Sequence, residues 1–130
     1  MFVDSSALVA MILPEPDGQA FASRLQESGE SFTSPVAIFE TTLALRRMRG
    51  APLAEVVLVI EEFLRRAGSH IVQVDADDHI GALQAFEMYG KGTGSPAQLN
   101  LSDCFAYAVA KRLGVPLLYK GYDFAHTDLA

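Results

Sequence analysis

Four acidic residues lie where short apolar segments give way to turns or helices, or one turn inside the following helix: Asp4, Glu40, Asp103 and Asp123. A single carboxylate in such a place is most often a helix cap or a turn former. Together they carry more weight, because the chain alternates between strands and helices and parallel sheets collect functional groups beyond the strand carboxyl ends. Carboxylates that converge there repel one another unless a divalent cation neutralises them. The pattern predicts one shared cation site.

The chemistry of such a site follows from its ligands. Mg²⁺ and Mn²⁺ prefer carboxylate and water oxygens and keep several waters, so they suit an open acidic pocket. A cation held there can polarise a phosphoryl oxygen, generate hydroxide near neutral pH and stabilise a leaving oxygen. The acids therefore indicate phosphodiester hydrolysis. The histidines have no zinc-ligand spacing, and the only cysteine, Cys104, is expected to be an inert core residue.

The elements that must position these acids can be read from apolar spacing and from proline and glycine punctuation. Strands are predicted at residues 1–4, 31–34, 70–74 and 117–120, and helices at 7–13, 17–29, 35–49, 52–68, 76–89 and 102–113. This alternation predicts one α/β domain over residues 1–130, a three-layer α/β/α sandwich with a mostly parallel central sheet. We expect Ser102 to cap the last helix, and residues 90–96 to form a mobile loop. In the helix at 76–89 we expect four side chains to face inward, those of Ile80, Leu83, Phe86 and Met88.

Composition limits the classes of protein. Half of the 130 residues are hydrophobic, which leaves apolar surface for a partner. The net charge of −6 argues against nucleic acid, unless a bound cation cancels the clustered acids and leaves basic groups free for phosphates. No apolar run approaches the roughly 20 residues of a membrane helix, and one cysteine forms no intrachain disulfide. We therefore expect a cytoplasmic protein without a membrane segment.

Two segments carry a more specific pattern: MFVDSSALVA at the N-terminus, and LNLSDCFAYAVAKRLGVPLLYKGYDF followed by HTD near the C-terminus. In these segments the chain resembles the PIN-domain family, specifically the VapC-type toxins of bacterial toxin–antitoxin pairs, and the resemblance covers the whole chain. Two residues depart from the family pattern, since Ser102 stands where glycine is commoner and Tyr122 replaces the usual asparagine.

The resemblance implies an endoribonuclease dependent on Mg²⁺ or Mn²⁺ and held inactive by a cognate VapB-type antitoxin. Its acidic constellation would be Asp4, Glu40, Asp103 and Asp123. A homodimer is expected. The apolar stripe of the helices at 37–48 and 53–64 would suit an antitoxin helix.

Four further residues are auxiliary candidates: Ser6, Arg47, Asn100 and Asp128. Ser6 could hydrogen-bond a carboxylate or a metal-bound water, or it could only cap a helix. Arg47 follows Glu40 by seven residues on the same helical face, where it could draw an RNA phosphate toward the metal or simply interact with the helix dipole. Asn100 belongs to the motif around Asp103, and Asp128 is a candidate fifth acid.

Two alternatives stay open. One is a non-catalytic RNA- or protein-binding module on the same fold. The other is a magnesium-dependent phosphotransfer or phosphatase domain, which would need an aspartate nucleophile in a D-x-D context or a phosphoacceptor with a lysine partner. Asp4 is followed by two serines, and Lys120 is the only plausible lysine. A covalent aspartyl-phosphate would distinguish that class.

Overall fold

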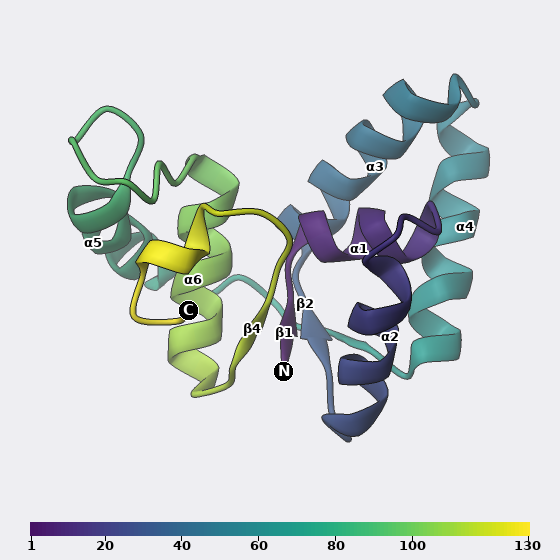
Figure 1. Cartoon of the computed structure of the whole chain (residues 1–130), viewed down its shortest axis with the longest axis horizontal. Helices are drawn as coiled ribbons and strands as arrows, with labels where there is room; N and C mark the ends of the chain where they lie inside the picture. Colours follow the sequence, from purple (N-terminus) through teal and green to yellow (C-terminus); the bar gives the residue numbers. More distant parts are fainter.

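A four-stranded parallel sheet lies at the centre of the computed structural model, which describes all residues from 1 to 130 (Figure 1). The strands are β1 (Phe2–Val3), β2 (Phe32–Thr33), β3 (His70–Ile71) and β4 (Leu117–Leu118). They are ordered β3-β2-β1-β4, and every neighbouring pair is parallel. All four predicted strands are present, although only two residues of each belong to the ladder.

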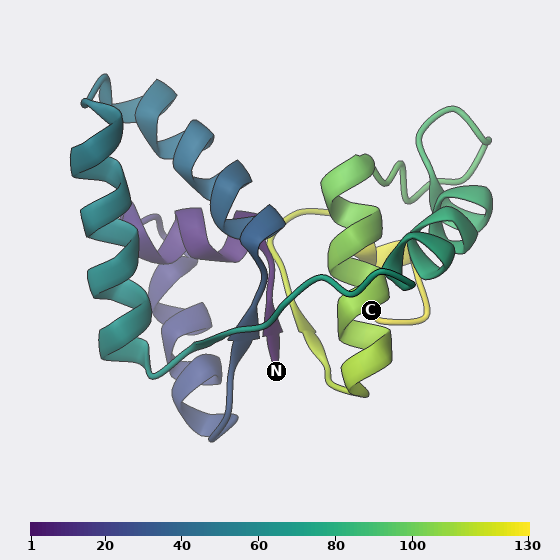
Figure 2. The same cartoon turned by 180° about the vertical axis from the view of Figure 1, so that it is seen from behind.

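Helices cover both faces of this sheet, so the predicted three-layer α/β/α sandwich is confirmed. Figures 1 and 2 show α1 (Ser5–Ile12), α2 (Gly18–Glu27), α3 (Pro35–Arg49) and α4 (Leu53–Ala67) on one side. On the other side lie α5 (Asp78–Tyr89) and α6 (Leu101–Leu113), with a short 3₁₀ helix, η1 (Phe124–His126), near the C-terminus. None of the helices combines the length and the apolar character that crossing a bilayer requires.

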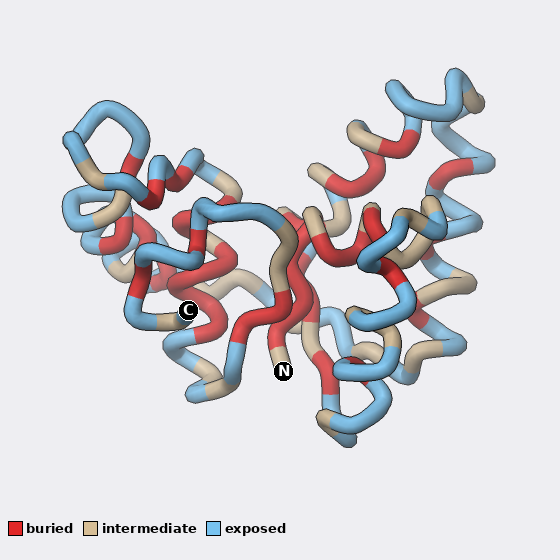
Figure 3. The backbone as a smooth tube through the Cα atoms, viewed as in Figure 1, coloured by how far each residue is buried: buried red, intermediate tan, exposed pale blue.

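The strands divide the core into two clusters. Successive side chains of a strand point to opposite faces of the sheet. Phe2 and Leu117 accordingly pack among residues of α5 and α6, whereas Val3 and Leu118 pack among residues of α1 to α4. Figure 3 shows the continuous buried backbone where these strands run side by side. Strands β1 and β4 are thus buried on both faces, which fixes the loops at their carboxyl ends.

The predicted inward face of α5 is wrong. Ile80, Leu83, Phe86 and Met88 are 45 to 64% exposed, and the buried apolar residues of this helix are Ala82 and Ala85. The cause is close packing against α6: a Cβ added at Gly81 would lie 3.2 Å from the Ala108 Cβ. Helices approach this closely only through small side chains, so the small face is buried and the larger apolar residues remain on the surface.

Residues 90–96 form a series of turns between α5 and α6. Two backbone hydrogen bonds close this segment, from Lys91 N to Leu99 O and from Leu99 N to Tyr89 O, each 2.9 Å long. The mobility expected for this loop stays a prediction.

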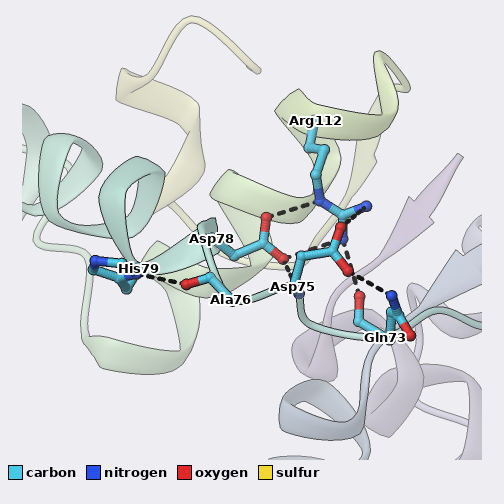
Figure 4. A network of polar contacts seen from close by, with 6 residues as sticks. All are labelled: Gln73, Asp75, Ala76, Asp78, His79 and Arg112. Carbon is cyan, nitrogen blue, oxygen red and sulfur yellow. Dashed lines mark hydrogen bonds and ion pairs between the residues drawn. The ribbon is translucent and has the colours of Figure 1, made fainter.

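A network of ion pairs and hydrogen bonds links the segment between β3 and α5 to the C-terminal end of α6 (Figure 4). Arg112 donates to both carboxylate oxygens of Asp78, from Nε at 2.8 Å and from Nη2 at 3.1 Å. The same guanidinium donates to the Gln73 carbonyl at 2.9 Å, and its Nη1 lies 3.2 Å from Asp75 Oδ2. Arg112 holds the pKa of Asp78 below its ordinary value. The network therefore sets where α5 begins relative to α6.

Replacing Arg112 by alanine should lower the free energy of unfolding by about 2 to 4 kcal/mol, because it leaves the Asp78 carboxylate buried without its cation. Urea unfolding at neutral pH measures this loss. Since the pKa of Asp78 is depressed, the stabilisation is present above the unfolded pKa of about 3.8 and is lost as the pH falls through the lower folded value. Arg66→Ala, which breaks an exposed pair with Glu62, is the matched control and should change stability far less, because water screens an exposed ion pair. Equal losses in the two variants would contradict the role given to Arg112.

Candidate active site

The four predicted acids come from four separate parts of the fold. Asp4 directly follows β1, Glu40 lies in α3 after β2, Asp103 is in the first turn of α6, and Asp123 lies in the turn after β4. Strands β1 and β4 are parallel neighbours, and α3 and α6 contact each other across this end of the sheet. The charges of Asp4, Glu40 and Asp123 all act to raise the pKa of Asp103. In the structure the other three acids therefore lie close enough to Asp103 for their charges to interact with it.

Asp4 is the most deeply buried of these acids, with 2% of its surface exposed. It caps α1: its Oδ2 accepts hydrogen bonds from Ser6 N at 2.9 Å and from Ser6 Oγ at 2.6 Å. Its Oδ1 is buried and has no hydrogen-bond partner. Burial raises the pKa of Asp4, while the Ser6 hydrogen bonds act in the opposite direction. An unpaired buried carboxylate oxygen is unfavourable unless it meets a cation or a proton, so Oδ1 marks a place for one.

Ser6 connects two strand ends. Its hydroxyl donates to Asp4 and accepts a hydrogen bond of 2.9 Å from the backbone N–H of Lys120, just beyond β4. Of the two roles open to Ser6, the structure therefore contains the hydrogen bond to a carboxylate. Its contribution to activity stays a prediction.

Asp103 is held by a reciprocal cap at the start of α6. Asn100 Oδ1 accepts from Asp103 N at 3.0 Å, and Asp103 Oδ2 accepts from Asn100 N at 2.8 Å. Asn100 is therefore the N-cap, and the expectation that Ser102 caps this helix is wrong. Ser102 lies inside the first turn and donates its hydroxyl to Asn100 Oδ1 at 2.8 Å, because the asparagine oxygen already occupies the capping position.

The electrostatics of Asp103 are those of a carboxylate crowded by others. Burial, the largest influence, and the charges of the other three acids raise its pKa to about 7, against the opposing hydrogen bond from Asn100 N. Near neutral pH this group is therefore divided between its charged and neutral forms. A bound cation would favour the charged form.

Glu40 is half-buried, and its Oε2 accepts a hydrogen bond of 2.5 Å from Ser5 Oγ. This contact was not predicted from the sequence. The sequence did contain a signal for it: two serines directly follow Asp4, so one hydroxyl can hydrogen-bond to Asp4 and the other to a second acid. Asp123 differs from the other three acids because it is exposed, and its side chain makes no capping hydrogen bond to η1.

The remaining candidates lie apart from these acids. Asp128 accepts hydrogen bonds from Tyr107 Oη at 2.8 Å and from Lys111 Nζ at 2.5 Å, so it is paired along the later turns of α6. It is not among the charges that raise the pKa of Asp103. Arg47 is exposed in the last turn of α3 and takes part in no ion pair.

The donor set fits a hard divalent cation, since it consists of carboxylates and includes the unpaired Asp4 Oδ1. The side chains are not drawn together into a finished ligand shell: no three aspartate, glutamate, histidine or cysteine residues are arranged to hold a metal ion. The acids thus form an open cluster, which agrees with the preference of Mg²⁺ for one or two carboxylates plus waters and substrate oxygens.

Comparison with known proteins gives the family. The family model of the PIN domain matches residues 1–129. A VapC ribonuclease of Rhizobium meliloti is 38% identical over 139 residues, which cover 98% of each chain. Ribonuclease VapC30 of Mycobacterium tuberculosis is 40% identical over 130 residues, covering 100% of this chain and 96% of its own. The crystal structure of Mycobacterium tuberculosis VapC20, described as a sarcin-ricin loop cleaving toxin, superposes with a TM-score of 0.71 over 95% of this chain and 92% of its own; at 19% identity this shows a shared fold. The chain therefore belongs to the PIN-domain family and, within it, to the VapC ribonucleases.

Proposed function

We propose that this protein is the toxin of a toxin–antitoxin pair, an endoribonuclease that hydrolyses RNA phosphodiester bonds with Mg²⁺ or Mn²⁺. The observations that carry the proposal are the charges of Asp4, Glu40 and Asp123 acting together on Asp103, and the unpaired, buried Oδ1 of Asp4. The sequence also supports the proposal, since the chain is about 40% identical to VapC ribonucleases over its full length.

The residues that would hold the cation are Asp4, Glu40, Asp103 and Asp123. A bound Mg²⁺ or Mn²⁺ would polarise the phosphoryl group and lower the pKa of a neighbouring water. The chain itself holds these carboxylates in place: Ser6 fixes one oxygen of Asp4, and Asn100 fixes one oxygen of Asp103. Asp123 is exposed, so we place the entry of the RNA strand on its side of the site.

RNA binding needs positive charge despite the net charge of −6. Arg46, Arg47 and Arg49 lie exposed in the last turn of the helix that carries Glu40. We assign to Arg47 the contact with an RNA phosphate, because it lies two helical turns from Glu40 on the same face. The guanidinium would position the backbone rather than read the base sequence.

Two apolar surfaces support the proposed partners. A groove of about 530 Å³ lies beside α3 and α4, and its apolar lining includes Ile38, Phe39, Leu43, Leu53, Val57 and Ile71. We assign it to a segment of a VapB-type antitoxin, since an amphipathic helix buries its apolar face in such a groove. The exposed face of α5, with Leu83 and Phe86, is assigned to a second copy of the chain in a homodimer.

We place the protein in the cytoplasm, where its RNA substrate is found and where the Cys104 thiol stays reduced.

The alternatives have less support. Lys120 Nζ forms ion pairs with Glu15 and Asp17, so the one lysine that could serve a phosphoacceptor aspartate is already paired with two other acids. A non-catalytic module would have no need to bury acids beside one another, and it is burial, with a smaller contribution from neighbouring acids, that raises the pKa of both Asp4 and Asp103.

Cleavage of total cellular RNA by the purified, antitoxin-free protein tests the proposal. With Mg²⁺ or Mn²⁺ we expect discrete fragments, which disappear with EDTA and in the Asp4→Ala variant. Intact RNA after incubation with folded, metal-loaded protein would favour the binding module. A phosphorylated aspartate detected by mass spectrometry would favour the phosphotransfer class instead.

A further inference from the structure

We infer that Ser5 is a positioning residue for Glu40, which holds one carboxylate oxygen of this acid and leaves the other free for the cation. The inference rests on the proposed function, since it concerns the same site. Ser5 Oγ donates to Glu40 Oε2 at 2.5 Å, across a separation of 35 residues in the chain. No other hydrogen bond of the protein reaches the Glu40 carboxylate, so Oε1 has no partner within the chain.

Ser5 is a fixed point from which to hold another side chain. It is the first residue of α1, directly after the strand residue Asp4, and only 7% of its surface is exposed. The cap of α1 is formed by the Asp4 side chain, so helix formation does not need the Ser5 hydroxyl. Ser6 serves Asp4 and the backbone of Lys120. The two serines therefore have separate roles: Ser6 hydrogen-bonds to Asp4, and the Ser5 hydroxyl hydrogen-bonds only to Glu40.

Glu40 requires such a contact for two reasons. Its side chain is long and flexible, and it is only half-buried in α3, so helix packing does not fix its carboxylate. The charges of Asp4 and Asp103 lie close enough to interact with that of Glu40, and like charges drive it toward solvent. The Ser5 hydroxyl opposes this repulsion with a charge-assisted hydrogen bond, which holds Glu40 inward before any cation binds.

The measurement is the affinity for Mn²⁺, followed by isothermal titration calorimetry and by the electron paramagnetic resonance signal of free Mn²⁺. The full chain is compared with Ser5→Ala, Ser5→Thr and the matched control Ser31→Ala. Ser31 is also buried, and its hydroxyl forms a 2.7 Å hydrogen bond with Ser69 Oγ before β2, at the opposite end of the sheet from the acids. Both alanine variants thus lose one hydroxyl contact, but only one of them frees a carboxylate.

Ser5→Ala should weaken Mn²⁺ binding about tenfold, the effect typical of residues that orient a metal ligand. Ser5→Thr, which keeps the hydroxyl, should bind within about threefold of the natural protein, and Ser31→Ala should bind as the natural protein does. Thermal unfolding in EDTA should place the two alanine variants close together, which separates cation binding from stability.

Each outcome decides a different point. Unchanged Mn²⁺ affinity in Ser5→Ala, beside a natural protein that binds Mn²⁺ and cleaves RNA, would overturn the inference and leave the proposed function standing. An equal loss of affinity in Ser31→Ala would also overturn it, because the effect would then be general loosening. A natural protein that binds no Mn²⁺ and cleaves no RNA would overturn the proposed function and the inference with it.

Discussion

Replacing Asp4 by asparagine is expected to slow RNA cleavage by roughly a hundredfold or more while the protein stays folded. Residues that only orient metal ligands change activity by about ten- to a hundredfold, so loss of a ligand should exceed that range. The asparagine oxygen can still accept the two hydrogen bonds from Ser6, which preserves the cap of α1. A neutral amide nitrogen then stands where the unpaired Oδ1 lies, and it cannot bind a cation.

Single-turnover cleavage with Mg²⁺ measures the loss, and circular dichroism confirms that the variant is folded. The matched control is Asp77→Asn, which changes an exposed N-cap aspartate of α5 whose side chain makes no capping hydrogen bond. It should cleave at the natural rate. Full activity in Asp4→Asn would remove Asp4 from the site and point to a different set of ligands.

The parts of the fold that could be predicted are those decided locally. Helix α3 begins at Pro35 after the cap Ser34 and ends at Gly50, whose φ of 62° suits a residue without a side chain. The topological rule for parallel sheets then placed Asp4 near the acids of other elements, before any distance was known. Such features depend on residues within a few positions of one another, or on a rule that holds for a whole class of folds.

The orientation of α5 could not be predicted because it is decided by the partner helix. The sequence of α5 offers two faces, a large apolar one around Leu83 and a small one around Ala82. The small face is buried because α6 presents small residues such as Ala108, which allow the backbones to approach closely. The apolar pattern of one helix carries no information about the width of the space it must fill.

The proximity of the four acids could be predicted from the sequence, but the hydrogen bonds that support them could not. Ser5 and Glu40 are 35 residues apart, and their contact depends on side-chain rotamers that spacing does not reveal. Asn100 and Ser102 are both residue types that cap helices, and their order could be settled only by the reciprocal bonds between Asn100 and Asp103. The positions of the acid side chains depend on such supports.

The free energy of unfolding of the metal-free protein is expected to fall as the pH rises from about 5 to about 7, chiefly because of Asp103. The pKa of this group is raised from 3.8 to about 7 in the folded protein. Between these values the folded state binds more protons than the unfolded state, so each pH unit can remove up to about 1.4 kcal/mol. The stabilisation is complete below the unfolded pKa and is lost as the pH passes the folded pKa. Burial raises the pKa of Asp4 as well, which adds to the slope with the same sign.

Asp103→Asn removes the larger part of this dependence and should be more stable than the natural protein at about pH 8 by a few kcal/mol. Its amide oxygen can still accept the hydrogen bond from Asn100 N, so the reciprocal cap of α6 is kept. Urea unfolding in EDTA at about pH 6 and pH 8 measures both slopes, and the titration of the histidines cancels in the comparison. Parallel pH dependence in the two proteins would contradict the crowding of the four acids. Added Mg²⁺ at the higher pH should stabilise the natural protein far more than the variant, because the charge that destabilises the empty site is the one that binds the cation.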